Sequence, residues 1–70
     1  MQRWEYRILA RTFNQGGGSA TYEWPDKKDK RSGEEVVNAM GLEGWELVTV
    51  TVVPLGGYGH LQYFFKRPRA

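Results

Sequence analysis

The segment Gly44-Trp45-Glu46-Leu47-Val48 constrains the fold more than any other part of the chain, because it joins the end of a helix to the start of a strand. Upstream of it, Ser32 and Glu35 have the spacing of a capping box, in which each side chain accepts a hydrogen bond from the backbone amide of the other residue. We therefore expect a helix to begin at Ser32 and to lead into a strand near residue 45.

The helix can end at either of two glycines, Gly41 or Gly44. Either Gly41 or Gly44 can take the left-handed conformation that closes a helix in a Schellman motif. We favour Gly44, because Trp45 then contacts Met40 and turns directly into the next strand. Both glycines fall on the same helical stripe as Val36, and we expect them to let the helix backbone approach a sheet closely.

Three segments have the pattern of strands. Residues 3–11 alternate, residues 45–53 form a β-branched run, and residues 60–66 follow a glycine-rich turn that predicts a hairpin. Within the first segment, one alternating set is more apolar than the other, and we expect it to face the core. That set consists of Trp4, Tyr6, Ile8 and Ala10.

In the second strand, Trp45 and Leu47 belong to one alternating set and Val48, Val50 and Val52 to the other, so the strand is either apolar on both faces or contains a bulge. We expect Trp45 and Leu47 to be core residues. A helix of about three turns can cover only one face of a three-stranded sheet. The uncovered face would be an apolar patch of the kind that marks an interface, and its predicted residues are Leu9, Val48, Val50, Val52 and Phe64.

Residues 14–31 are expected to form a flexible loop. The segment begins with a glycine run and ends in a mixed-charge run, neither of which offers much apolar surface to bury. We expect the loop to be dispensable for folding. Tyr22 and Trp24 are costly residues to leave in water, and they either form a short extended segment on the sheet or meet a partner.

Composition limits the class of protein. The chain has 70 residues, a net charge of +2 and no cysteine, which indicates one small domain whose core supplies only about 3–5 kcal/mol of net stability without disulfides. Oligomerisation is the remaining usual source of stability. We find no apolar run long enough to span a bilayer and no signal peptide, so we expect a cytoplasmic protein.

The residues needed for enzyme chemistry are scarce. His60 is the only histidine, which excludes a histidine metal site within one chain, and a catalytic triad lacks an obvious nucleophile. Neither glycine run is followed by the lysine and helix of a phosphate-binding loop. We therefore expect a protein without enzymatic activity and without a cofactor.

Binding of single-stranded nucleic acid is the main alternative, because aromatic residues stand beside basic ones near the C-terminus and a second basic cluster lies near residue 30. Aromatic stacking combined with neutralisation of phosphates is how proteins hold single strands. Aromatics at alternating strand positions more often pack into a core or an interface, and the net charge is low. The candidate contacts are Lys27, Lys28, Lys30, Arg31, Tyr63, Lys66, Arg67 and Arg69.

Three stretches resemble a family of small bacterial and phage proteins known as domain of unknown function 4177. They are Trp4-Glu5-Tyr6, the segment of residues 38–48 that ends in Gly44-Trp45-Glu46-Leu47-Val48, and Phe64-Phe65-Lys66-Arg67-Pro68. The resemblance implies a compact β-α-β-β domain and brings no established activity or catalytic residue. The chain departs from the family pattern in residues 12–31.

The sequence thus predicts a single α+β domain over residues 1–70, with a three-stranded antiparallel sheet and one helix on one face. We expect a non-catalytic interaction module that forms a homo-oligomer or docks on a larger protein through its sheet. The alternative is a single-stranded nucleic-acid-binding protein.

Overall fold

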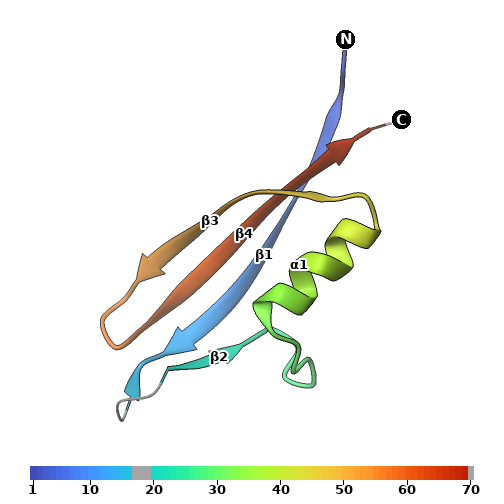
Figure 1. Ribbon diagram of the computed structural model, residues 1–70. Coiled ribbons are helices and arrows are strands. Elements are labelled where there is room, and N and C mark those ends of the chain that lie inside the picture. The colour runs from blue at the N-terminus through green and yellow to red at the C-terminus, as the bar shows by residue number, and fades with distance from the viewer. Residues whose placement is uncertain (17–19, 70) are drawn as a thin grey trace.

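A computed structural model of the chain describes residues 1–16 and 20–69. It confirms the α+β class, but the antiparallel sheet has four strands rather than three, in the order β2-β1-β4-β3. The helix lies on one face of this sheet, and the two ends of the chain lie together at one end of it (Figure 1). The elements are β1 (Trp4–Asn14), β2 (Thr21–Glu23), α1 (Gly33–Leu42), β3 (Glu46–Pro54) and β4 (Tyr58–Pro68).

The fourth strand comes from the segment expected to be a loop. β2 pairs with the end of β1, with Phe13 opposite Tyr22 in the register, and their rings lie 6.4 Å apart. The interpretation of residues 14–31 as one unstructured loop is therefore wrong at β2, and the alternative of a short extended segment on the sheet is confirmed. Residues 17–19, which that loop included, lie outside the described residues.

The helix begins and ends as the sequence predicts. Both hydrogen bonds of the capping box between Ser32 and Glu35 are present, each 3.1 Å long. Gly44 has a φ of 88°, and the amides of Gly44 and Trp45 donate to the carbonyls of Gly41 and Met40. These two bonds are those of a Schellman motif closed by Gly44.

The glycines do not serve helix–sheet packing. A Cβ atom added at Gly41 or Gly44 would meet no atom within 4 Å, so neither glycine marks a close approach of the helix to the sheet. The expectation of such an approach is wrong, because the stripe that α1 buries consists of Val36 and Met40 alone.

The core lies between α1 and one face of β1 and β4. Val36 and Met40 of the helix are buried together with Tyr63 and Phe65 of β4, and Leu9 of β1 packs against them. The prediction for β1 is therefore wrong in its choice of face: the set that includes Leu9 faces the helix. The more apolar set, namely Trp4, Tyr6, Ile8 and Ala10, lies exposed on the opposite face.

Trp24 is the fifth buried residue of the core. Its indole N–H donates to the carbonyl of Arg31 at 2.7 Å, and its ring lies 5.6 Å from that of Tyr63. The expectation that residues 14–31 contribute little to packing is wrong at this position. Trp45 is only half-buried and Leu47 is 37% exposed, so Phe65, at 1% exposure, occupies the centre that we assigned to them.

The predicted hairpin joins β3 to β4. Leu55 donates its amide to the carbonyl of Tyr58 at 2.7 Å, and Gly56 takes a φ of 82° in the turn. The register shifts between Leu47 and Thr49, which places a β-bulge at Val48 and confirms that β3 contains an irregularity.

Candidate functional site

β3 is the most exposed of the long elements. It forms one edge of the sheet, where β4 is its neighbour in the strand order, and all nine of its residues are exposed. The helix covers β1 and β4 and leaves β3 outside the buried cluster. Between Glu46 and Pro54 the strand carries only leucine, valine and threonine, so it presents a long uncharged edge to solvent.

The five residues predicted to line an interface do not share one face. Leu9 and Val50 both lie opposite Tyr63 in the register, and Val52 lies opposite Leu61, so these three are on the side that carries the helix. Phe64 alternates with Tyr63 and is on the open side. The expectation of a single uncovered face is wrong, because Phe64 belongs to the alternating set of β4 that faces away from the helix.

The bulge residue itself, Val48, is exposed and stands at the point where the alternation changes. Upstream of it, Leu47 is on the helix side, opposite Phe65. Three of the five predicted residues therefore form an exposed apolar strip with Leu47 along β3. That strip consists of Leu47, Val48, Val50 and Val52.

The open face of the sheet carries a second apolar group that sequence reasoning assigned to the core. Tyr6 is 70% exposed and Ile8 is 58% exposed, and Ile8 lies opposite the half-buried Phe64. Nearby, the Lys66 ammonium lies 4.4 Å from the centre of the Trp4 ring. The alternation of β1 shows that these side chains share a face, but not which of the two faces the helix covers.

The basic residues near the C-terminus lie on opposite faces. Lys66 is on the open face, whereas Arg67 is on the helix side, where it is ion-paired with Glu5 and donates to the carbonyl of Glu43 at 2.9 Å. Its guanidinium also lies 4.2 Å from the centre of the Trp45 ring. Tyr63, the aromatic contact predicted beside them, is buried in the core, so its ring cannot stack on a base.

The remaining basic candidates are at other places on the molecule. Lys27, Lys30 and Arg31 line a pocket near β2, and Lys28 lies in the adjoining turn, where its amide donates to Asp26. Arg69 follows β4, and its amide donates to the carbonyl of Arg3. Because β2 lies at the opposite end of the sheet from the C-terminus (Figure 1), the eight predicted nucleic-acid contacts do not form one surface.

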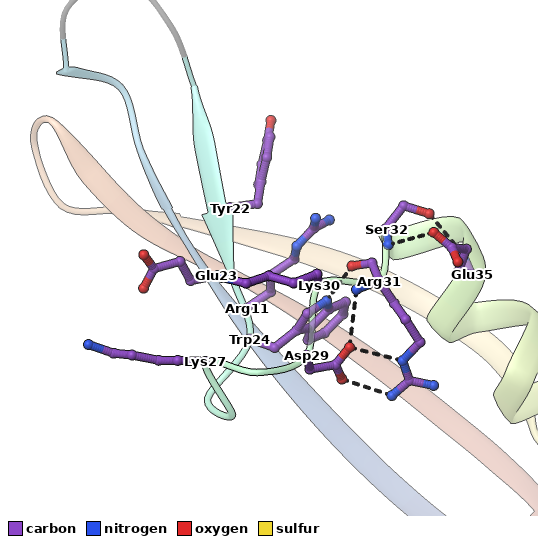
Figure 2. Close-up of a pocket in the computed structure, with 10 residues that line it drawn as sticks. All are labelled: Arg11, Tyr22, Glu23, Trp24, Lys27, Asp29, Lys30, Arg31, Ser32 and Glu35. Carbon is purple, nitrogen blue, oxygen red and sulfur yellow. Dashed lines mark hydrogen bonds and ion pairs between the residues drawn. The ribbon is translucent and has the colours of Figure 1, made fainter.

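The pocket near β2 has a volume of about 350 Å³. Figure 2 shows the Arg11 side chain rising from β1 between Tyr22 and Trp24, with the charged side chains around it. The Arg11 guanidinium lies 4.6 Å from the centre of the Tyr22 ring and 5.0 Å from that of Trp24, a geometry that stabilises the cation. The residues that line the pocket are Arg11, Tyr22, Glu23, Trp24, Lys27, Asp29, Lys30, Arg31, Ser32 and Glu35.

Ion pairing and capping already use much of the charge in this pocket. The guanidinium of Arg31 donates to Asp29 at 2.8 and 2.9 Å, and Glu35 caps the helix. The side-chain and backbone hydrogen bonds from Arg31 lower the pKa of Asp29 from 3.8 to about 2, and the same contact raises the pKa of Arg31. The lining therefore holds both acidic and basic groups, and part of that charge is already paired.

Arg11 is the residue of this site that sequence reasoning missed. It was assigned to the solvent-facing set of β1, whereas its Nε is buried without a hydrogen-bond partner among the described atoms. The strand alternation around Arg11 does not indicate such a buried position. The available indication was the pair Tyr22 and Trp24, because a nearby arginine side chain can pack on aromatic rings and shield them from water.

A histidine metal site and a catalytic triad were also considered from the sequence. His60 stands on β4 opposite Thr12 and Val53. Among residues 1–16 and 20–69, no three histidine, aspartate or glutamate side chains are close enough to hold a metal ion. In the same part of the chain, no helix combines the length and the apolar character needed to cross a membrane.

Comparison with known proteins identifies the family of the chain. The profile of the family described as "Domain of unknown function (DUF4177)" matches residues 4–68, which includes every helix and strand. The curated proteins and the solved structures yield no significant match.

Proposed function

We propose that this chain, which belongs to the DUF4177 family of domains of unknown function, is a non-catalytic module that associates with its own copies through its β-sheet. The observation that supports the proposal is the exposure of large apolar side chains on both sides of the sheet. One helix of ten residues covers part of one face, and the rest of the sheet meets water.

The exposed residues are too numerous to be the scattered apolar side chains of an ordinary surface. On β3, Val52 is 57% exposed and lies in a strip with three other apolar residues, while Tyr6 and Ile8 are exposed on the open face. Covering the exposed half of one such side chain is worth about 1 kcal/mol. A domain of this size has about 3–5 kcal/mol of net stability, so covering several of them on association is a large gain.

The alternative function, binding of single-stranded nucleic acid, lacks a continuous surface. Its predicted aromatic contact Tyr63 is buried, and Lys66 and Arg67 lie on opposite faces of the sheet. A binding groove needs exposed aromatic rings beside a line of basic residues. Nucleic-acid binding is therefore an alternative outcome of the experiments below.

Sedimentation of the purified protein at micromolar concentrations and above tests the proposal. We expect a dimer or a larger assembly for the wild type, and a monomer for Val50→Glu, because an apolar interface tolerates an unpaired charge poorly. Leu42→Glu is the matched control: Leu42 is 91% exposed on the helix and away from the sheet, so this variant should retain the wild-type mass. Circular dichroism checks that both variants are folded.

A wild type that stays monomeric at every concentration contradicts the proposal. Titration with a single-stranded oligonucleotide at two salt concentrations, using wild type and Lys66→Glu, distinguishes the alternative. Tight binding that weakens steeply with salt and is lost in Lys66→Glu would favour nucleic-acid binding instead.

A further inference from the structure

The outer edge of β3 carries backbone groups that the sheet does not use. In an antiparallel ladder, alternate residues bond to the neighbouring strand. The bond from the amide of Leu55 to the carbonyl of Tyr58 sets the phase of this alternation. From that pair, every second residue of β3 bonds to β4, and the residues between them, Val50, Val52 and Pro54, direct their backbone groups outward.

This edge lacks the usual protection against pairing. Natural edge strands are short, charged, covered, or interrupted by a proline or a bulge along the exposed part. β3 has nine residues, and its bulge and its proline lie near opposite ends, at Val48 and Pro54, which leaves the middle of the strand without either. No charged residue stands between Glu46 and Pro54. The part of β1 not paired with β2 is also an edge, but it carries Glu5 and Arg7.

We propose that β3 pairs with β3 of a second copy of this chain in antiparallel orientation, which joins the two four-stranded sheets into one. The inference rests on the proposed self-association and names the strand that carries it. A second copy fits this edge because it offers a strand of the same length with no charge between Glu46 and Pro54, so that no like charges meet along the paired part.

The positions of the bulge and the proline indicate the register. With Thr51 on the two-fold axis, Val50 of each copy pairs with Val52 of the other, and all four backbone bonds come from regular parts of the strand. Val48, at the bulge, then lies opposite Pro54 of the second copy, which has no N–H to leave unpaired. Glu46 lies beyond the bulge, beside the uncharged turn of the second copy, so the one charge at the end of the strand meets no other.

Single cysteine substitutions test this register, because the chain has no cysteine of its own. Thr51→Cys places the two sulfur-bearing residues opposite each other in a non-hydrogen-bonded pair, where Cα atoms are about 4.5 Å apart and a disulfide can form. We expect Thr51→Cys to give a disulfide-linked dimer under mild oxidation. Thr49→Cys is the matched control on the same face, with its two copies about 13 Å apart at 3.3 Å per residue.

Proline substitutions test the outward-directed amides. Val52→Pro removes an amide that points away from β4, so the chain should remain folded. The dissociation constant of the dimer should rise at least about tenfold, because two symmetric hydrogen bonds across the interface are lost. Thr51→Pro removes an amide bonded to β4 and should unfold the hairpin. Circular dichroism and sedimentation measure the two effects.

The outcomes separate this inference from the proposed function. A monomeric wild type contradicts both self-association and the pairing of β3. A dimeric wild type that is unaffected by Val52→Pro and not cross-linked through Thr51→Cys leaves self-association intact but places it on another surface, such as the open face. Cross-linking through Thr49→Cys, with none through Thr51→Cys, contradicts the register that we propose.

Discussion

At the scale of single residues, Arg31 shows how a polar segment becomes ordered without a core of its own. Its side chain pairs with Asp29, its amide donates to the same carboxylate, and its carbonyl accepts the indole N–H of Trp24. A mixed-charge run that sequence reasoning placed in solvent thus holds a buried tryptophan in position. The periodicity of apolar residues does not predict local hydrogen bonds of this kind.

The Asp29–Arg31 contact has a measurable signature in pH. The folded-state pKa of Asp29, about 2, lies below its ordinary value of 3.8, so any stability from the pair is present above about pH 4 and is lost as the pH falls towards 2. Arg31→Gln should raise the Asp29 pKa towards 3.8. Carboxyl NMR titration measures both values, and an unchanged pKa in the variant would show that Arg31 is not the cause. Because the pair lies at the surface, its effect on stability should be small and should weaken with salt.

At the scale of elements, α1 shows the clearest agreement between sequence and structure. The capping box at Ser32 and the Schellman motif at Gly44 are local motifs, formed by residues within a few positions of one another. The packing role that we gave to the glycines was wrong, because it depended on how the helix sits on the sheet. Gly41 and Gly44 therefore have different roles although both belong to the same stripe.

This difference predicts opposite effects of one substitution. Gly41 lies within α1 without a positive φ and with open space around its Cβ position, so Gly41→Ala should stabilise the protein by about 0.5–1 kcal/mol. Gly44 has a positive φ, and Gly44→Ala should destabilise the protein by about 1–2 kcal/mol. Chemical denaturation of the two variants measures the effects, and a loss of stability in Gly41→Ala would mean that the glycine has a packing role after all.

At the scale of the whole molecule, which measures 50 × 22 × 16 Å overall, a long sheet is paired with one short helix. The helix covers the middle strands, Trp24 extends the cover towards β2, and β3 and the open face remain exposed. This imbalance between sheet and cover is what supports the proposal of self-association. It also makes the few buried residues decisive for folding.

Two tryptophans at different depths test this arrangement. Trp24→Ala should cost about 3–5 kcal/mol, as truncation of a large buried aromatic does, which is comparable with the whole stability of the domain. Trp4→Ala, on the open face, should cost only about 1 kcal/mol, mainly through loss of contact with Lys66. Thermal unfolding followed by circular dichroism compares them, and a Trp24→Ala protein with a native melting temperature would contradict the role of Trp24 in the core.

The sequence by itself determined the features that depend on neighbouring residues, namely the start of α1, the hairpin at Gly56 and the alternation of β1. It narrowed the end of α1 to Gly41 or Gly44 and gave two alternatives for β3, one of which was a bulge. The tertiary structure alone decided which face of β1 the helix covers, because alternation is symmetric between the two faces and amphipathic aromatics such as Trp4 and Tyr6 tolerate water. It also decided that Phe65 and Trp24 are buried while Val50 and Val52 lie along an edge. Burial depends on which distant segments meet, and strand order, which places β3 at the edge, follows from pairings between residues far apart in the chain.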